Sequence, residues 1–235
     1  MNCLILAAGH GSRLREISES KPLTPIAGVP LIEHVVRAAM AAGATRFTVV
    51  TGHQAARVEA FLAELAARVG TAIACVRIAD WDLPNGHSVL VGAARIDGDY
   101  LLLMSDHLFD PALARRLLDE RPAGAALTLA VDSDWRRESL DLDDATKVAS
   151  EGDRITGIGK TLDVFDAVDT GVFVATPALA EVLNAAIAEG EAGSLSQGVQ
   201  RLADQGRAAV VDVTGLMWLD VDDPIALAKA EALFA

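Results

Sequence analysis

The sequence predicts a single α/β domain, residues 1–235, with a mostly parallel, mixed sheet and helices on both faces. Three observations support this fold class. Strand-like and helix-like segments alternate through the first half of the chain. Two of the strand-like segments there, 2–7 and 100–104, are apolar runs, as in strands that are buried on both faces. Finally, 51% of the 235 residues are hydrophobic, enough for a sizeable core.

The first half of the chain has the clearest pattern. Helices are expected at 31–42, 55–69, 87–96 and 111–120, and strands at 2–7, 47–51, 73–78 and 100–104. Gly43 is placed to end the first helix, and Asp110 is placed to cap the fourth, with Pro111 in its first turn. This alternation predicts parallel strands joined by right-handed crossovers.

The second half changes character after residue 122. Strands are expected at 125–131, 146–150, 154–158, 168–175 and 208–213, and helices at 177–189, 195–205 and 223–233. Short turns such as 151–153 separate several of the strands, which predicts antiparallel or mixed strands added to one side of the sheet. The most polar stretch, 134–144, is expected to be a mobile loop.

Composition excludes several classes of function. The net charge is −13 and no basic run is present, so nucleic acid is not an expected partner. No apolar stretch approaches the roughly 20 residues that span a bilayer, and residues 1–6 carry no basic leader, so a cytoplasmic protein is expected. Cys3 and Cys75 lie in apolar runs without metal or disulfide spacing and are expected to be buried thiols.

A glycine-rich segment after the first strand carries the strongest chemical signal. It reads A-A-G-H-G-S-R-L at 7–14, and K-P-L follows at 21–23. Glycines let the backbone approach a ligand closely, and their N–H groups can form an anion-binding nest. Arg13 offers a planar fork for phosphate oxygens and Lys21 a point charge. The spacing fits neither the dinucleotide fingerprint nor a Walker loop, and it predicts a phosphate-binding loop with the backbone of Leu6, Ala7, Ala8, Gly9, Gly11 and Ser12.

Carboxylates follow two of the expected strands. Asp106 comes directly after the apolar run 100–104, where open α/β sheets bind ligands. Asp220 and Asp222 alternate on an extended segment and should face one side, while Asp223 is placed to cap the last helix ahead of Pro224. Mg²⁺ prefers such oxygen ligands. From the pattern alone, Asp106 fits a turn cap equally well, and 220–223 also fits a solvated acidic turn.

The glycine-rich segment, K-P-L and the segment G-V-P-L-I at 28–32 resemble those of the sugar-phosphate and alcohol-phosphate nucleotidyltransferases. The resemblance extends over essentially the whole chain. It implies a Rossmann-like, GT-A-like fold in which Asp106 and Asp222 hold Mg²⁺ and Asp220 is a further ligand or support. It also implies that Arg13 and Lys21 are catalytic and hold the departing pyrophosphate, so catalysis would consist of positioning and electrostatics.

Within that group, N-G-H-S at 85–88 resembles a segment of the inositol-1-phosphate cytidylyltransferases. Five further segments resemble theirs in the same order: M-S-D-H at 104–107, D-A-T-K-V at 144–148, I-G-K at 158–160, V-D-T-G at 168–171 and W-L-D-V-D at 218–222. The resemblance implies a nucleotide-binding half at about 1–122 and an acceptor-binding half at about 123–235. It assigns the nucleotide to Asn85, Gly86 and Ser88, the acceptor phosphate to Lys147 with help from Lys160, and the acceptor hydroxyls to Asp169 and Thr170.

The implied reaction transfers CMP from CTP to a small phosphorylated alcohol, 1L-myo-inositol-1-phosphate, and releases pyrophosphate. Several relatives carry a fused membrane phosphotransferase that this sequence lacks, so a separate CDP-alcohol phosphotransferase is the expected recipient of the product. Phosphocholine, an aminoalkylphosphonate and a hexose-1-phosphate are alternative acceptors, although Leu23 rather than Lys after Pro22 favours the cytidylyltransferases.

Two different classes of protein are also compatible with parts of this sequence. One is a nucleotide-binding regulatory module without activity, and the second is a GT-A glycosyltransferase that uses D-V-D at 220–222 as its metal site. The D-V-D segment lies near the end of this chain rather than in its middle, which disfavours the glycosyltransferase. The choice between CTP and UTP, and between monomer and homodimer, stays open at this point.

Overall fold

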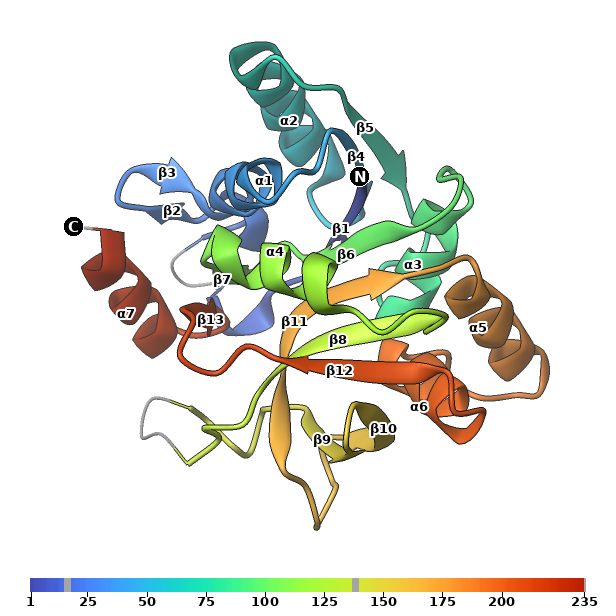
Figure 1. The fold of residues 1–235 in the computed structure, drawn as a ribbon. Helices are drawn as coiled ribbons and strands as arrows, with labels where there is room; N and C mark the ends of the chain where they lie inside the picture. Colours follow the sequence, from blue (N-terminus) through green and yellow to red (C-terminus); the bar gives the residue numbers. More distant parts are fainter. Residues whose placement is uncertain (15–17, 137–139, 235) are drawn as a thin grey trace.

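The computed structural model describes residues 1–14, 18–136 and 140–234. A nine-stranded sheet runs through the molecule in the order β5-β4-β1-β6-β11-β8-β12-β10-β9 (Figure 1). The strands of this sheet are β1 (Asn2–Ala7), β4 (Arg46–Thr51), β5 (Ile73–Arg77), β6 (Tyr100–Met104), β8 (Leu127–Asp132), β9 (Lys147–Glu151), β10 (Arg154–Gly159), β11 (Ala167–Ala175) and β12 (Ala208–Asp212). The helices are α1 (Leu31–Ala41), α2 (Ala55–Val69), α3 (Asn85–Ala93), α4 (Pro111–Glu120), α5 (Ala178–Ala188), α6 (Leu195–Asp204) and α7 (Pro224–Phe234).

Strands β5, β4, β1 and β6 are parallel to one another, as the alternating pattern predicts. Strand β11 is antiparallel to both of its neighbours, β6 and β8, and the hairpin β9–β10 extends the sheet beyond β12. The strands of the second half are therefore all added on the β6 side of the parallel strands, in a mixed arrangement, as expected. The fold class, a mixed α/β sheet with helices on both faces, is confirmed.

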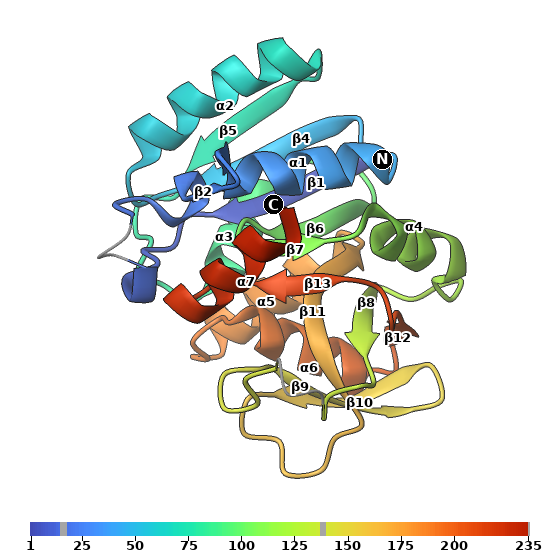
Figure 2. The same cartoon turned by 90° about the vertical axis from the view of Figure 1, so that its left-hand side faces the viewer.

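Two hydrophobic clusters lie on opposite faces of the sheet, and β1 supplies both. Cys3 and Ile5 pack with α1, α2 and α4, while Leu4 and Leu6 pack with α3, α5 and α6. Successive side chains of a strand point to opposite faces, so a continuously apolar strand requires a helix layer on each side. Figure 2 shows α1 and α2 along one side of this sheet and the β9–β10 hairpin at its far end.

Sequence reasoning missed several short elements. These are the hairpin β2 (Pro25–Ile26) and β3 (Val29–Pro30), the pair β7 (His107–Phe109) and β13 (Trp218–Asp220), and the 3₁₀ turns η1 (Ser12–Leu14) and η2 (Lys21–Leu23). Two or three residues are too few to show a period in the sequence. The pair β7–β13 matters for function because its register sets Asp220 opposite His107, next to Asp106.

Most expected bounds agree within two residues, and the caps show where local chemistry decides them. Asp110 accepts a hydrogen bond from Ala112 N at 2.7 Å, and Asp223 accepts one from Ala226 N at 2.7 Å, so both expected caps are confirmed. The cap of α1 is Ala42, and Gly43 follows it with φ +100°. Helix α3 begins at Asn85, two residues earlier than expected, with Pro84 as its cap.

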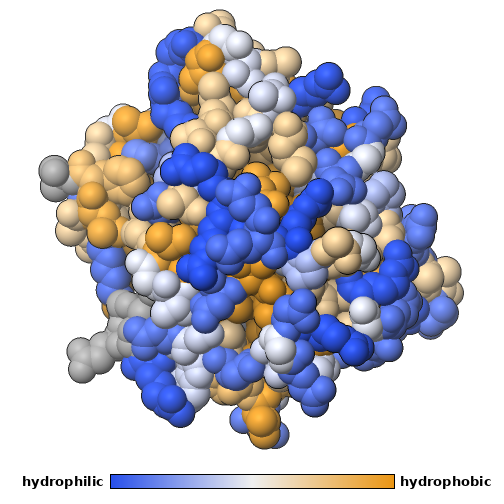
Figure 3. Space-filling model, in the orientation of Figure 1, coloured by the Kyte–Doolittle hydropathy of each residue, from blue (hydrophilic) through white to orange (hydrophobic). Residues whose placement is uncertain are grey.

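The outer parts of the molecule include an exposed charged patch over α4 and a third, smaller hydrophobic cluster beneath α7. Figure 3 shows a hydrophilic patch over α4, whose outward side chains include Arg115, Arg116, Asp119 and Glu120. Helix α7 packs through Ala230 onto a cluster with Leu14, Ile26 and Leu31.

Among the described residues, no helix combines the length and apolar character that crossing a membrane requires. Cys3 is fully buried as expected, whereas Cys75 is only partly buried.

Candidate active site

A cavity of about 700 Å³ opens at the edge of the sheet where β1 and β6 end. Helix α7 and β13 lie in front of this edge (Figure 2). The strand ends and the following loops supply its lining, as expected for an open α/β sheet. The predicted site residues that line it are Leu6, Ala8, Gly9, Gly11, Arg13, Lys21, Asn85, Ser88, Asp106, Lys160, Asp169, Asp220 and Asp222.

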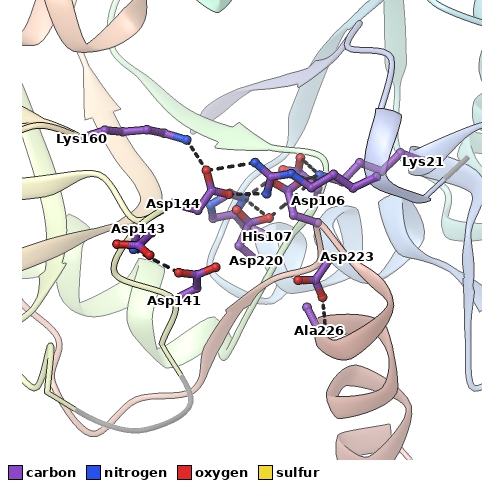
Figure 4. Close-up of polar contacts among 12 residues, drawn as sticks. Lys21, Asp106, His107, Asp141, Asp143, Asp144, Lys160, Asp220, Asp223 and Ala226 are labelled. Carbon is purple, nitrogen blue, oxygen red and sulfur yellow. Dashed lines mark hydrogen bonds and ion pairs between the residues drawn. The ribbon is translucent and has the colours of Figure 1, made fainter.

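Lys21 lies at the centre of the site (Figure 4). Only 7% of this residue is exposed, and its amine donates to Asp106 Oδ2 at 2.5 Å and to Asp222 Oδ1. A lysine is rarely so buried unless it is paired. Asp106 comes from the end of β6, Lys21 from η2 and Asp222 from beyond β13. The amine therefore joins segments that are far apart in the chain.

Arg13 and Lys160 both pair with Asp144, which sequence reasoning did not assign to the site. The Arg13 guanidinium contacts both oxygens of Asp144, at 2.5 and 3.1 Å, and lies 3.3 Å from Asp222 Oδ2. Lys160 donates to Asp144 Oδ1 at 2.5 Å. The Arg13 hydrogen bond and then Lys160 hold the pKa of Asp144 well below its usual range, against the effect of partial burial. Asp144 thus links the phosphate-loop side of the cavity to the β9–β11 side.

His107 is a second residue that the sequence did not single out. Its Nδ1 lies 2.8 Å from Asp106 Oδ1 and 3.7 Å from Asp220 Oδ1. Burial alone would lower the pKa of His107, but Asp220 and Asp106 outweigh it and raise that pKa to about 9. At neutral pH the imidazole is therefore a cation that, with Lys21, offsets the carboxylates.

The carboxylates fit a divalent cation. Carboxylate oxygens of Asp144, Asp220 and Asp222 lie within 4.8 Å of one another, and an Asp106 oxygen lies within the same distance of Asp220. Asp220 Oδ1 is buried and has no hydrogen-bond partner, and burial followed by the neighbouring Asp106 raises the pKa of Asp220 although His107 opposes it. A buried carboxylate oxygen without a donor needs a positive partner, and an oxygen-rich set of this kind suits Mg²⁺.

The predicted acceptor residues separate into two groups. Lys160 and Asp169 line the cavity, and burial raises the pKa of Asp169 to about 6 although the Gly171 N–H donates to it at 2.7 Å. Thr170 is fully buried and its hydroxyl donates to Ala130 O at 2.8 Å, so its side chain does not face the cavity. Lys147 donates to Lys160 O at 2.7 Å and lies outside the lining.

The predicted nucleotide residues also separate. Asn85 Oδ1 accepts a hydrogen bond from Leu195 N at 2.8 Å, which leaves the Nδ2 amide group as the donor it can offer to a ligand. The Gly86 backbone approaches another segment rather than the cavity: a Cβ on Gly86 would lie 2.2 Å from Gly193 O. Ser88 lies inside α3 and lines the cavity, so it does not cap that helix. Ala7 faces the α1 side of the sheet, and the Ser12 side chain lies outside the described residues.

Trp81, Lys229 and Thr146 also line the cavity and were missed. Trp81 is 40% exposed, and its Cβ packs where a side chain at Gly52 would lie. An exposed tryptophan beside a cavity is a signal that composition alone cannot show. The loop 134–144 was expected to be mobile; residues 137–139 of it lie outside the described residues, so this expectation stays untested.

Gly11 and Gly9 differ in a way that can be tested. Gly11 has φ +61°, and a Cβ on it would lie 2.5 Å from Lys21 Cβ, whereas a Cβ on Gly9 would meet nothing within 4 Å. We expect Gly11→Ala to destabilise the free protein by about 1–2 kcal/mol because alanine resists this conformation. The measurement is thermal unfolding without ligand. Gly9→Ala is the matched control and should leave the unfolding temperature unchanged, while raising the KM for the nucleotide if the Gly9 backbone approaches phosphate. Equal unfolding temperatures for both variants would contradict this reading of Gly11.

The fold defines the class of protein: the mixed sheet with its helices has the architecture of nucleotidyltransferases. The sequence pattern described as MobA-like NTP transferase domain matches residues 3–212, and the chain therefore belongs to this family. The fold of UDP-glucose pyrophosphorylase in complex with UDP-glucose is similar, with a TM-score of 0.83 at 18% identity over 99% of this chain and 97% of that one.

Two similar proteins bear more specific names. The inositol-1-phosphate CTP transferase from T. maritima superposes with a TM-score of 0.87 at 26% identity, over 99% of this chain and 94% of that one. The Bifunctional IPC transferase and DIPP synthase of Rubrobacter xylanophilus is 36% identical over 233 residues, which are 97% of this chain and 51% of that protein. The chain spans about half the length of the curated relatives it matches.

Proposed function

We propose that the chain is a Mg²⁺-dependent cytidylyltransferase that transfers CMP from CTP to 1L-myo-inositol-1-phosphate and releases pyrophosphate. The observation that carries this proposal is the buried Lys21 amine between Asp106 and Asp222, in a cavity that Arg13 and Lys160 also line. The names of the T. maritima transferase and the R. xylanophilus relative support the choice of nucleotide and acceptor.

The chemistry needs no nucleophile or general base from the protein. A phosphate monoester has a second pKa near ~6 and is mostly doubly ionised at neutral pH. One of its oxygens attacks the α-phosphorus of CTP. The bond from this phosphorus to the bridging oxygen breaks, and the electron pair leaves with pyrophosphate.

The role of the protein is then to hold two anions together, despite a net charge of −13. Arg13 and Lys21 would exchange their carboxylate partners for oxygens of the triphosphate, and Lys160 would turn to the acceptor phosphate. This local positive charge offsets repulsion and aligns the reacting atoms. Asp106, Asp220 and Asp222 would hold Mg²⁺, which when bound neutralises charge that develops on the phosphate oxygens. The division into a nucleotide-binding half and an acceptor-binding half stays part of this proposal.

The cavity favours a polyol over choline as the acceptor alcohol. A trimethylammonium group is recognised by the exposed faces of aromatic rings. Among the described lining residues, Phe173 and Trp218 are 1% and 7% exposed, and Trp81 adjoins Gly52 together with Ala8 of the glycine-rich segment. Asp169, Thr146 and Lys160 instead offer a polar wall, which suits hydroxyl groups beside a phosphate. The CDP-alcohol formed would be the substrate of a CDP-alcohol phosphotransferase.

Pyrophosphate release tests the proposal. The purified protein with Mg²⁺ and each of the four nucleoside triphosphates is offered inositol-1-phosphate, phosphocholine, 2-aminoethylphosphonate or glucose-1-phosphate. We expect turnover with CTP and inositol-1-phosphate. Turnover with CTP and another acceptor alone would retain the cytidylyltransferase and reject the polyol, and turnover with glucose-1-phosphate alone would support a hexose-1-phosphate enzyme. Nucleotide binding without turnover of any pair would overturn the proposal in favour of a binding module.

Trp81 provides an optical readout of the nucleotide. Trp81 is 40% exposed, lines the cavity and adjoins Gly52 together with Ala8, so a base could stack on its indole. We expect CTP to quench the tryptophan fluorescence of the protein and Trp81→Phe to abolish most of that quenching. Trp135→Phe is the matched control, because Trp135 is half-buried against Phe165 and outside the lining. Unchanged quenching in the Trp81 variant would place the base elsewhere.

A further inference from the structure

A buried carboxylate outside the cavity, that of Asp132, makes contacts the proposed reaction does not use. Asp132 is the last residue of β8 and is 1% exposed. Its Oδ2 accepts a hydrogen bond from Trp218 Nε1 at 2.8 Å, and its Oδ1 accepts one from Asp134 N at 2.9 Å. The Thr214 hydroxyl lies 3.2 Å from the same Oδ1. Asp132 therefore contacts the segment that follows β8 and the segment between β12 and β13.

The contact with Trp218 fixes the strand that carries Asp220. Trp218 is the first residue of β13, which has three residues and, within the part of the chain that the structure describes, pairs with the three residues of β7 alone. So short a pair has few backbone hydrogen bonds to hold its position. The indole has a single N–H donor with a fixed direction, so its hydrogen bond to a buried carboxylate fixes the rotation of the ring, which also packs in the α1–α2–α4 cluster. This explains why the W-L-D-V-D segment begins with tryptophan.

The other oxygen of Asp132 shapes the start of the segment that leads to Asp144. Asp134 N is held at the first turn after β8, and Leu142 and Ala145 of the same segment pack against the core near its far end. Asp132 thus contacts both the start of the segment after β8 and the first residue of β13. In Figure 1, β8 and β12 lie side by side, and the chain after β12 turns back to β13.

We propose that Asp132 is a positioning residue for the carboxylate cluster: through its hydrogen bond to Trp218 it sets the strand that carries Asp220 and leads to Asp222. This inference rests on the proposed metal-dependent function. Groups that orient metal ligands typically change metal affinity or activity by about 10- to 100-fold when they are removed.

Asp132→Asn is the first variant. In either orientation of the amide, its NH₂ group would face an obligatory donor, the Trp218 indole or the Asp134 N–H. We expect Mn²⁺ to bind about tenfold more weakly, measured by the electron paramagnetic resonance of free Mn²⁺ in a titration of the purified protein without substrates. The same variant should lower kcat with little change in the KM for CTP.

Trp218→Phe is the second variant and carries the test if the first does not fold. It keeps an aromatic ring in the cluster and removes the donor together with part of the indole, so it should also weaken Mn²⁺ binding. In the double variant with Asp132→Asn, the repulsion between two N–H donors is absent. We expect it to bind Mn²⁺ at least as tightly as whichever single variant binds Mn²⁺ less tightly. Such non-additive effects would show that the two side chains are directly coupled. Ser133→Ala is the matched control, since the Ser133 hydroxyl donates to Asp212 at 2.9 Å in the same network without touching Asp132 or Trp218.

The outcomes separate the inference from the proposed function. Weakened Mn²⁺ binding in both single variants but not in Ser133→Ala would support the positioning role. Unchanged binding in both single variants, with normal binding by the unaltered protein, would overturn the inference and leave the proposed function standing. Failure of the unaltered protein to bind Mn²⁺, with or without CTP, would instead reject the metal-dependent function.

Discussion

Asp106→Asn is expected to reduce kcat by roughly 10²- to 10³-fold or more, the scale seen when a group that stabilises transition-state charge is lost. Asp106 Oδ2 bonds to Lys21 at 2.5 Å and Oδ1 to His107 at 2.8 Å, at the end of β6. Burial would raise its pKa, but Lys21 and then His107 hold that pKa far below its usual range, so this group is an anion at neutral pH. The amide keeps the shape and loses the charge that a divalent cation requires.

Asp110→Asn is the control for this prediction. It makes the same chemical change four residues away, at a helix cap where asparagine serves as well as aspartate. Pyrophosphate release and thermal unfolding are measured for both variants. We expect Asp110→Asn to retain activity, and Asp106→Asn to stay folded and lose it. An Asp106 variant within tenfold of the unaltered kcat would show that the cluster around Lys21 is not the reaction centre.

The fold could be predicted wherever a segment was long enough to show a period. The bounds of β1, α2, β6 and α4 match the expected ranges, because each combines a continuous apolar run or a helical stripe with clear turn residues. The insertion of β11 between β6 and β8 could not be predicted, since the order of strands depends on packing between distant segments. The pair β7–β13 was too short to show a pattern of its own.

The candidate site shows the same division. Lys21, Asp106 and Asp222 were expected from motifs, and the structure brings them together. Asp144 was part of a recognised segment but had no role, because only folding brings Arg13 and Lys160 to its carboxylate. Gly86 shows the opposite case. It was expected to let the backbone approach a ligand, but glycine is needed there because a side chain would collide with the Gly193 carbonyl oxygen. A sequence motif can identify residues of a site, whereas the role of each residue depends on the neighbours that folding brings to it.

Lys21→Met is the second prediction with a large effect, and its two readouts should move in opposite directions. We expect kcat/KM for CTP to fall by roughly 10²- to 10³-fold, because a buried cation that can bind the triphosphate is lost. We expect Mn²⁺ without nucleotide to bind at least as tightly as to the unaltered protein. In the ligand-free site the Lys21 amine occupies Asp106 and Asp222 and lies 4.0 Å from Asp220, so it competes with a metal ion for these oxygens.

Lys160→Met is the matched control for Lys21→Met. Its exposed amine pairs with Asp144 alone among the described carboxylates, so we expect a raised KM for the acceptor, little change in the KM for CTP and unchanged Mn²⁺ binding. Kinetics and the Mn²⁺ titration are run on both variants. Weaker Mn²⁺ binding by Lys21→Met would mean that the amine supports the carboxylate cluster instead of competing with the metal. In that case, movement of the Lys21 amine from the carboxylates to the triphosphate could not be what frees Asp106 and Asp222 to bind the metal ion when the nucleotide arrives.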